Sequence, residues 1–235
     1  LVAAAGAWWA LRPRPVPEGG LQFTLPLPAG EHLPQFANVV VSPDGRSVAF
    51  ASVDSLGIQA LWVRRFDSLA SVRLPGTEGA QYPFWSPDSR QIGFFSGRRL
   101  ARVGVDGGPV ATVCEIELGR GASWSRGGTI VFAGSSEGPL LRVPAVGGAP
   151  VPATPLDTLN GETSHRWPFF LPDGRHFLYA AIGGNWQTFG LFVGSLDSDR
   201  RVFLGEVGSG AAYTSGLLVY LLNGTLEARP FDAHR

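Results

Sequence analysis

Short apolar runs alternate with turn-forming residues along most of the chain. Two of these runs, at residues 48–50 and 92–95, directly follow tight-turn sequences and are almost continuously apolar. Short runs rich in Val, Ile and Phe favour β-strands, and continuous apolar character is typical of strands covered on both faces. Downstream of Leu11 the sequence has no long stretch with convincing helical periodicity. The pattern therefore predicts an all-β protein.

A turn motif recurs about every 40 residues, a spacing that is typical of repeat architectures. Each copy has an aromatic or aliphatic residue, a sequence close to Ser-Pro-Asp-Gly, and a second apolar run. Pro presets φ for a tight turn, Asp accepts hydrogen bonds from its own backbone, and Gly adopts positive φ. The copies begin at Val41, Trp85, Trp124 and Phe170, with a degenerate fifth copy at Tyr213. The expected turn residues are Pro43, Asp44, Gly45, Pro87, Asp88, Pro172, Asp173 and Gly174.

The second half of each unit predicts another hairpin. In the middle copies a Gly-Gly pair, at residues 107–108 and 147–148, separates two strand-like runs. Four short strands in a unit of about 40 residues match one propeller blade. We therefore expect a β-propeller of four-stranded antiparallel blades, with about four and a half blades present and an incomplete ring. A closed four-bladed ring with an added hairpin is the alternative. Residues 21–25 are expected to form a strand that closes the last blade.

The N-terminal segment has a different character. Residues 1–11 are uncharged and apolar, and Trp8 and Trp9 precede Arg12 and Arg14. Aromatic and then basic residues are typical of the interfacial end of a membrane span, whereas a signal-peptide core is the alternative. We expect residues 1–19 to be the end of a transmembrane helix with a Pro-rich linker, and residues 20–235 to be a C-terminally truncated propeller.

Composition narrows the function classes. Lys and Arg number 19, as do Asp and Glu, and the isoelectric point is about 7.1, so we expect no nucleic-acid binding. The single cysteine, Cys114, excludes an internal disulfide. The four histidines have no metal-ligand spacing, and no nucleophile-elbow motif is present. The sequence therefore predicts no metal, no cofactor and no catalytic residue.

The repeat resembles the Pro-Asp type of WD40-like repeat found in TolB and in prolyl oligopeptidase propellers. The resemblance covers roughly residues 20–235 and departs from the motif at residues 125–128, Ser-Arg-Gly-Gly. A more specific stretch, Gly-Glu-Thr-Ser-His-Arg-Trp-Pro at residues 161–168, precedes the turn at residues 171–174. Together with the N-terminal segment, it resembles the extracytoplasmic propeller of bacterial transmembrane serine/threonine kinases of the PknB-like type.

This resemblance implies a location and a role. In that family a cytoplasmic kinase domain precedes one membrane helix, so the propeller is expected on the periplasmic side of the inner membrane. The chain contains no kinase motif. We therefore expect a non-catalytic sensor or protein-interaction domain with an unidentified protein or small-molecule ligand. The alternatives are a TolB-like periplasmic scaffold and the non-catalytic propeller of a prolyl oligopeptidase-like serine peptidase.

One constellation is a candidate binding site: Glu162, His165, Arg166 and Trp167. A hydrogen-bond donor, a fixed positive charge and a flat aromatic face suit an anionic or carbohydrate-like ligand near the mouth of the channel. The alternative is structural, with an Arg166–Glu162 salt bridge and Trp167 packed between blades.

The remaining conspicuous residues favour structural roles. The acids Asp44, Asp88 and Asp173 are accounted for by their turns. Inter-blade packing similarly accounts for the aromatic residues at strand positions, which are Tyr82, Trp85 and Trp124.

Overall fold

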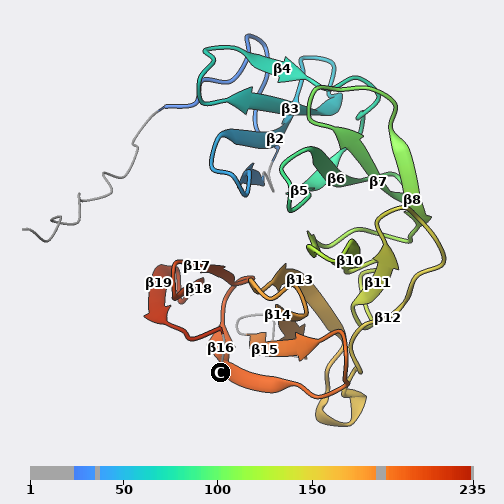
Figure 1. Cartoon of the computed structure of the whole chain (residues 1–235), viewed down its shortest axis with the longest axis vertical. Coiled ribbons are helices and arrows are strands. Elements are labelled where there is room, and N and C mark those ends of the chain that lie inside the picture. Colours follow the sequence, from blue (N-terminus) through green and yellow to red (C-terminus); the bar gives the residue numbers. More distant parts are fainter. Residues whose placement is uncertain (1–23, 35–37, 184–188, 234–235) are drawn as a thin grey trace, which may run out of the picture.

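The computed structural model describes residues 24–34, 38–183 and 189–233. It is an all-β propeller of five small antiparallel sheets arranged in a ring, as the repeat predicted (Figure 1). Four sheets have four strands and the fifth has three, which confirms the expected four and a half blades. The expected membrane segment and linker, residues 1–19, lie outside the described residues.

Each blade is one continuous stretch of sequence whose strands pair in chain order. Blade 1 contains β1 (Val39–Val41), β2 (Ser47–Val53), β3 (Gln59–Arg65) and β4 (Ser71–Arg73). Blade 2 contains β5 (Gln81–Trp85), β6 (Gln91–Ser96), β7 (Arg99–Gly104) and β8 (Ala111–Glu115). Blade 3 contains β9 (Ala122–Trp124), β10 (Thr129–Phe132), β11 (Leu141–Pro144) and β12 (Val151–Pro152). Blade 4 contains β13 (Ser164–Phe170), β14 (His176–Ile182), β15 (Phe189–Ser195) and β16 (Val202–Val207). Blade 5 contains β17 (Ala212–Thr214), β18 (Leu217–Leu222) and β19 (Thr225–Pro230).

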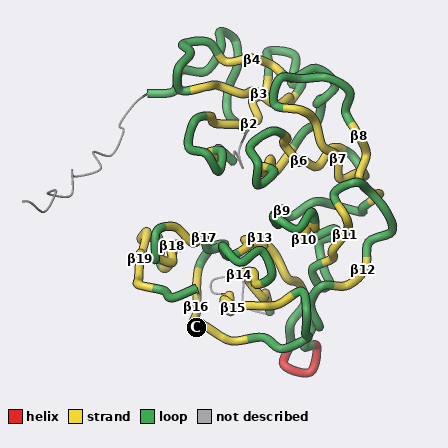
Figure 2. The backbone as a smooth tube through the Cα atoms, in the orientation of Figure 1, coloured by secondary structure: helices red, strands yellow, loops and turns green. Residues whose placement is uncertain are grey.

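The first strand of each blade is the innermost one. In Figure 1 the sheets follow one another as an arc that is open between blade 5 and blade 1. Neighbouring first strands contact each other from β1 through β5 and β9 to β13. A short 3₁₀ helix, η1 (Thr158–Asn160), connects blades 3 and 4 at the outside of the arc (Figure 2). No helix in the described part of the chain is long and apolar enough to cross a membrane.

The recurrent turn forms for a local chemical reason. In blade 1 the Ser42 hydroxyl donates to the Asp44 carboxylate at 2.5 Å and accepts from the Ser47 N–H at 2.9 Å. The same carboxylate accepts from the N–H of Arg46 at 3.0 Å, and Gly45 has a φ of 68°. These local bonds close the connection between β1 and β2, and the Asp44 N–H also donates to the Ser89 hydroxyl of blade 2 at 3.1 Å.

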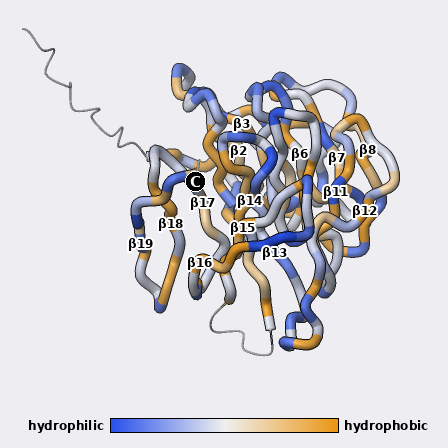
Figure 3. Tube along the Cα trace, turned by 60° about the horizontal axis from the view of Figure 1, so that its bottom comes forward, coloured by the Kyte–Doolittle hydropathy of each residue, from blue (hydrophilic) through white to orange (hydrophobic). Residues whose placement is uncertain are grey.

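Buried side chains fill the space between successive blades. Four large aromatic residues occupy matching positions in the second strands and are at most 1% exposed: Phe50, Phe94, Phe132 and Tyr179. Figure 3 shows hydrophobic segments along the strands and hydrophilic ones mainly in the turns. Because each blade presents apolar side chains to both neighbours, the second strands carry the continuous apolar runs seen in the sequence.

The expected closing strand is only partly within the described residues. Residues 21–23 lie outside them, and Thr24 and Leu25 are not in a strand. Within the described residues, β19 is therefore the outermost strand of blade 5.

Candidate functional site

The four residues of the predicted site lie at or just before the start of β13, but their side chains have different surroundings. Successive side chains of a strand point to opposite faces. His165 is fully buried, Arg166 and Trp167 are half-buried, and Glu162 precedes the strand. The structure therefore separates the constellation into a buried network at His165 and Glu162, an arginine that binds a loop of blade 3, and a tryptophan that lines the channel.

The buried network begins at His165, which is 0% exposed. Its Nδ1 is 2.8 Å from the Thr154 hydroxyl, and its Nε2 is 3.0 Å from the Glu162 carboxylate. The Thr154 oxygen also accepts from the main-chain N–H of Leu140 at 3.0 Å. Burial lowers the pKa of His165, and the Glu162 carboxylate opposes this only in part. The ring is therefore neutral, with Thr154 donating to Nδ1 and Nε2–H donating to Glu162.

Glu162 pairs with Arg201, whereas the structural alternative for this site paired it with Arg166. Arg201 Nη1 lies 2.5 Å and 2.8 Å from the two carboxylate oxygens of Glu162. Its Nη2 lies 3.2 Å from Asp157. Burial alone would raise the pKa of Glu162, but hydrogen bonds from Asp157 N–H, His165 and Arg201 lower it. No local pattern in the sequence indicates this partner, because two strands, β14 and β15, separate Arg201 from β13.

The order hydroxyl, imidazole, carboxylate at Thr154, His165 and Glu162 is that of a catalytic triad. A nucleophile must, however, be reachable by a substrate. Thr154 is 5% exposed, and its oxygen already accepts a main-chain N–H. Since Thr154 follows β12 and His165 lies in β13, the network joins blades 3 and 4. The geometry of the network therefore fits a structural role, in which hydrogen bonds hold blades 3 and 4 together.

Arg166 holds a loop of the neighbouring blade. Its Nη2 donates to the carbonyl of Ser136 at 2.8 Å, and its Nε donates to the Ser164 hydroxyl at 3.2 Å. The main-chain N–H of His165 also donates to the carbonyl of Gly138 at 2.9 Å. Hydrogen bonds therefore attach the start of β13 to the connection between β10 and β11.

Trp167 is packed between blades, as the structural alternative predicted. Its ring centre is 5.5 Å from that of Phe189. A Cβ on Gly121 of blade 3 would come within 3.1 Å of the indole, and one on Gly210, before blade 5, within 2.7 Å of the Trp167 Cβ. Glycine on both sides therefore lets the three chain segments approach closely.

Trp167 has a counterpart in blade 2. Tyr82 and Trp167 both precede a proline, at Pro83 and Pro168, and have φ of 47° and 51°. Strand pairing shifts register at both places, between residues 81 and 84 and between 166 and 169. Bulky residues rarely adopt positive φ, and such strain costs roughly 1–3 kcal/mol. The sequence pattern Gln/Arg-aromatic-Pro-Phe, at residues 81–84 and 166–169, is the signal for this equivalence.

The innermost strands enclose a central channel. Its larger part is a cavity of about 680 Å³ that all five blades line, including Trp85, Trp124 and Phe170. A smaller part of about 270 Å³ is lined by Asn38, Tyr82 and Trp167 among others. The two parts share lining residues: Val40, Pro83, Ala122, Pro168 and Phe169. The channel wall is thus continuous and mainly apolar, which suits a binding site.

A second hollow of about 380 Å³ lies between blades 4 and 5 and is lined by Leu171, His176 and Phe231 among others. In blades 1–3 a serine begins the turn, whereas blade 4 has Leu171. In blade 4 the turn acid therefore has other partners. His176 Nδ1 lies 2.5 Å from Asp173, and the His176 N–H donates to the same carboxylate at 3.0 Å.

No group of three or more His, Cys, Asp or Glu residues in the described ranges could hold a metal ion. Cys114 is buried, which raises its pKa to about 11 and keeps it a neutral thiol.

Comparisons with known proteins identify the fold. No family model and no curated protein matches this sequence. TolB from Acinetobacter baumannii superposes with a TM-score of 0.66 at 12% identity, covering 82% of this chain and 51% of that one. Putative TolB from Agrobacterium tumefaciens superposes with a TM-score of 0.62 at 16% identity, covering 72% of this chain and 65% of that one.

A peptidase structure shows a weaker likeness. An acylaminoacyl peptidase in complex with Z-Gly-Gly-Phe-chloromethyl ketone has a TM-score of 0.51 at 11% identity, covering 80% of this chain and 37% of that one. The chain spans less than two thirds of the length of each of these three structures. It therefore has a β-propeller fold similar to that of TolB and of peptidase propellers.

Proposed function

We propose that this chain is a non-catalytic binding propeller, the extracytoplasmic sensor of a membrane-anchored bacterial serine/threonine kinase. The observation that carries the binding role is the central channel. Strands from all five blades line it, and its wall is built mainly of Val, Pro and aromatic side chains. A concave apolar surface of this size, with a few polar groups at one end, is typical of ligand-binding sites.

The disposition of polar side chains supports a non-catalytic role. The hydroxyl, imidazole and carboxylate of Thr154, His165 and Glu162 form hydrogen bonds that join blades 3 and 4. The turn acids are likewise occupied, for example Asp88, which accepts from the Ser86 hydroxyl at 2.6 Å and from Arg90 N–H at 3.1 Å. These groups stabilise the scaffold and leave recognition to the channel.

The kinase association and the periplasmic location rest on the sequence. The supporting features are the segment at residues 161–168 and the apolar N-terminal run with Trp8, Trp9 and the following arginines. Fold likeness to TolB and to peptidases does not itself assign a role, because one fold supports many functions.

Determining the gene sequence on both sides of this chain tests the kinase association. We expect an upstream kinase catalytic loop of the His-Arg-Asp type, followed by one hydrophobic segment. A signal peptide without a kinase would assign the chain to a TolB-like scaffold. A downstream Gly-x-Ser-x-Gly hydrolase would assign it to a peptidase. Either of these outcomes contradicts the kinase proposal.

A further inference from the structure

Two arginines are sequence neighbours of residues that line the smaller part of the central channel. Arg120 directly precedes Gly121, and Arg166 directly precedes Trp167; Gly121 and Trp167 both line this part. The main-chain N–H of Trp167 points to the carbonyl of Arg120 at 3.4 Å. The two arginines therefore belong to adjoining segments of blades 3 and 4, next to residues that line the same part of the channel.

The positive charges of these arginines act on each other. Burial lowers the pKa of Arg166, and the charge of Arg120 lowers it further, whereas Tyr82 acts in the opposite direction. Both arginine side chains are half-buried, so water screens the repulsion less than at an open surface. An anion placed beside them would relieve this repulsion, and guanidinium groups bind carboxylates through paired N–H donors.

Beyond the arginines the channel is apolar. Pro83 and Pro168 line both parts of the channel, and Phe84, Trp124 and Phe169 continue the wall. Charge at one end and apolar surface along the length match a ligand with an acidic end and an apolar body.

The main chain of the channel wall favours a peptide as the apolar part of the ligand. Each innermost strand is the edge strand of its sheet, so its channel side has no neighbouring strand in that sheet. Edge strands present main-chain N–H and C=O groups that an extended peptide can pair with. A hydrocarbon chain would leave those groups without partners, which costs free energy.

We propose that the channel binds the carboxyl-terminal end of an extended apolar peptide, with its terminal carboxylate held by Arg120 and Arg166. The apolar side chains of the peptide pack against Phe84, Trp124 and Phe169, and its main chain pairs with the innermost strands. This inference rests on the proposed function, because it requires that the channel is the binding site.

Two random hexapeptide libraries provide the test, one with free C-terminal carboxylates and the other with C-terminal amides. Both are passed over the immobilised protein, and retained sequences are measured by titration calorimetry. We expect selective retention of the acids, and each selected acid should bind about tenfold or more tightly than its amide. Added salt should weaken the acid more than the amide.

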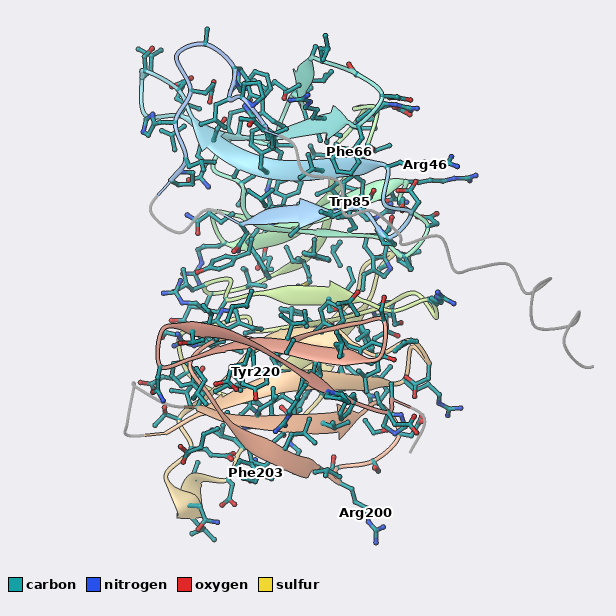
Figure 4. The ribbon with its side chains drawn as sticks, turned by 90° about the vertical axis from the view of Figure 1, so that its left-hand side faces the viewer. Arg46, Phe66, Trp85, Arg200, Phe203 and Tyr220 are labelled. Atoms are coloured by element: carbon teal, nitrogen blue, oxygen red, sulfur yellow. The ribbon has the colours of Figure 1, made fainter. Side chains whose placement is uncertain are left out.

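Arg120→Gln is the sharper variant, because Arg166 also holds Ser136. It should remove most of the preference for the acid and leave amide binding unchanged. Arg200→Gln is the control, since the Arg200 side chain extends away from the sheets into solvent (Figure 4). Thermal melts of the three proteins verify that each is folded.

The outcomes separate the two proposals. Equal retention of acids and amides overturns the carboxylate inference and leaves the binding function standing. Acid selectivity that survives both Arg120→Gln and Arg166→Gln overturns the assignment to these arginines. If neither library is retained, the channel is not a peptide site, and the peptide inference is wrong, whereas the kinase association is decided separately by the gene sequence.

Discussion

Single residues decide how blades 3 and 4 are held together. His165 is buried without charge between a hydroxyl and a carboxylate, and Arg201, directly before β16, neutralises that carboxylate. Both ring nitrogens of His165 and both carboxylate oxygens of Glu162 therefore have partners, which is the condition under which buried polar groups are tolerated. Removing one member should cost more than the hydrogen bond itself, because its partner is left buried and unpaired.

The pH dependence of stability should follow His165. Its pKa is lower in the folded protein than the ordinary value of 6.5, so the unfolded chain binds the proton more readily. The free energy of unfolding should therefore be greatest above pH 6.5 and fall as the pH decreases towards the lower folded-state pKa. Urea titrations between pH 5 and pH 8 measure this. Glu162, whose pKa is also lowered, adds a loss of the same sign at more acidic pH. A stability maximum near pH 5.5 would contradict this account.

Thr154→Val should destabilise the protein by about 1–3 kcal/mol, since it leaves the Leu140 N–H and His165 Nδ1 without their partner in a buried place. The substitution keeps the volume, so the loss reports the hydrogen bonds. Thr225→Val, on exposed β19, is the matched control and should change stability by less than about 0.5 kcal/mol. Equal effects of the two substitutions in a urea titration would show that the network adds no stability.

At the scale of the element, features that depend on neighbouring residues could be predicted from sequence, and features that depend on distant residues could not. The turns were predictable from sequence because Ser42, Asp44 and Gly45 supply their own hydrogen bonds and backbone conformation within a few residues. The strand order followed from the repeat. The pairing of Glu162 with Arg201 was not predictable, because it depends on how β13 and β16 are placed across a sheet. The aromatic residues before Pro83 and Pro168 were visible in the sequence. Their positive φ and the register shifts beside them were not predictable.

The approach of blade 5 to blade 4 depends on Gly210. A Cβ there would lie 2.7 Å from the Cβ of Trp167, closer than side-chain packing allows. Gly210→Ala should therefore lower the free energy of unfolding by about 1–3 kcal/mol. Gly127→Ala is the control, because its nearest neighbour is the Ser125 hydroxyl at 3.7 Å and its φ is not positive. Denaturant titration distinguishes them; a harmless Gly210→Ala would mean that blade 5 can shift freely.

At the scale of the whole molecule, the two ends of the arc expose apolar surface. On blade 1, Val39 and Val41 are 50% and 58% exposed, and on blade 5, Leu221 and Leu226 are 42% and 69% exposed. The outer edge of β19 has no neighbouring strand among the described residues. Apolar faces and open sheet edges promote association between chains.

We therefore expect the 235-residue chain to self-associate as its concentration rises, which sedimentation velocity detects. Leu226→Lys should shift the distribution towards monomer, because a charge on an edge strand opposes pairing. Leu159→Lys, at a 97% exposed leucine in η1 away from these faces, should not. A soluble monomer that unfolds cooperatively and reversibly would contradict this expectation.

The chain-order pairing inside each blade has a consequence for how such molecules change over time. Because every sheet is one uninterrupted segment, duplication or loss of a single stretch of gene adds or removes a complete blade without rerouting the chain. Each new copy brings one more innermost strand to the ring. Ancestral copy number therefore sets the bore of the channel, while substitutions at its rim set what the channel recognises, and the two properties can evolve separately.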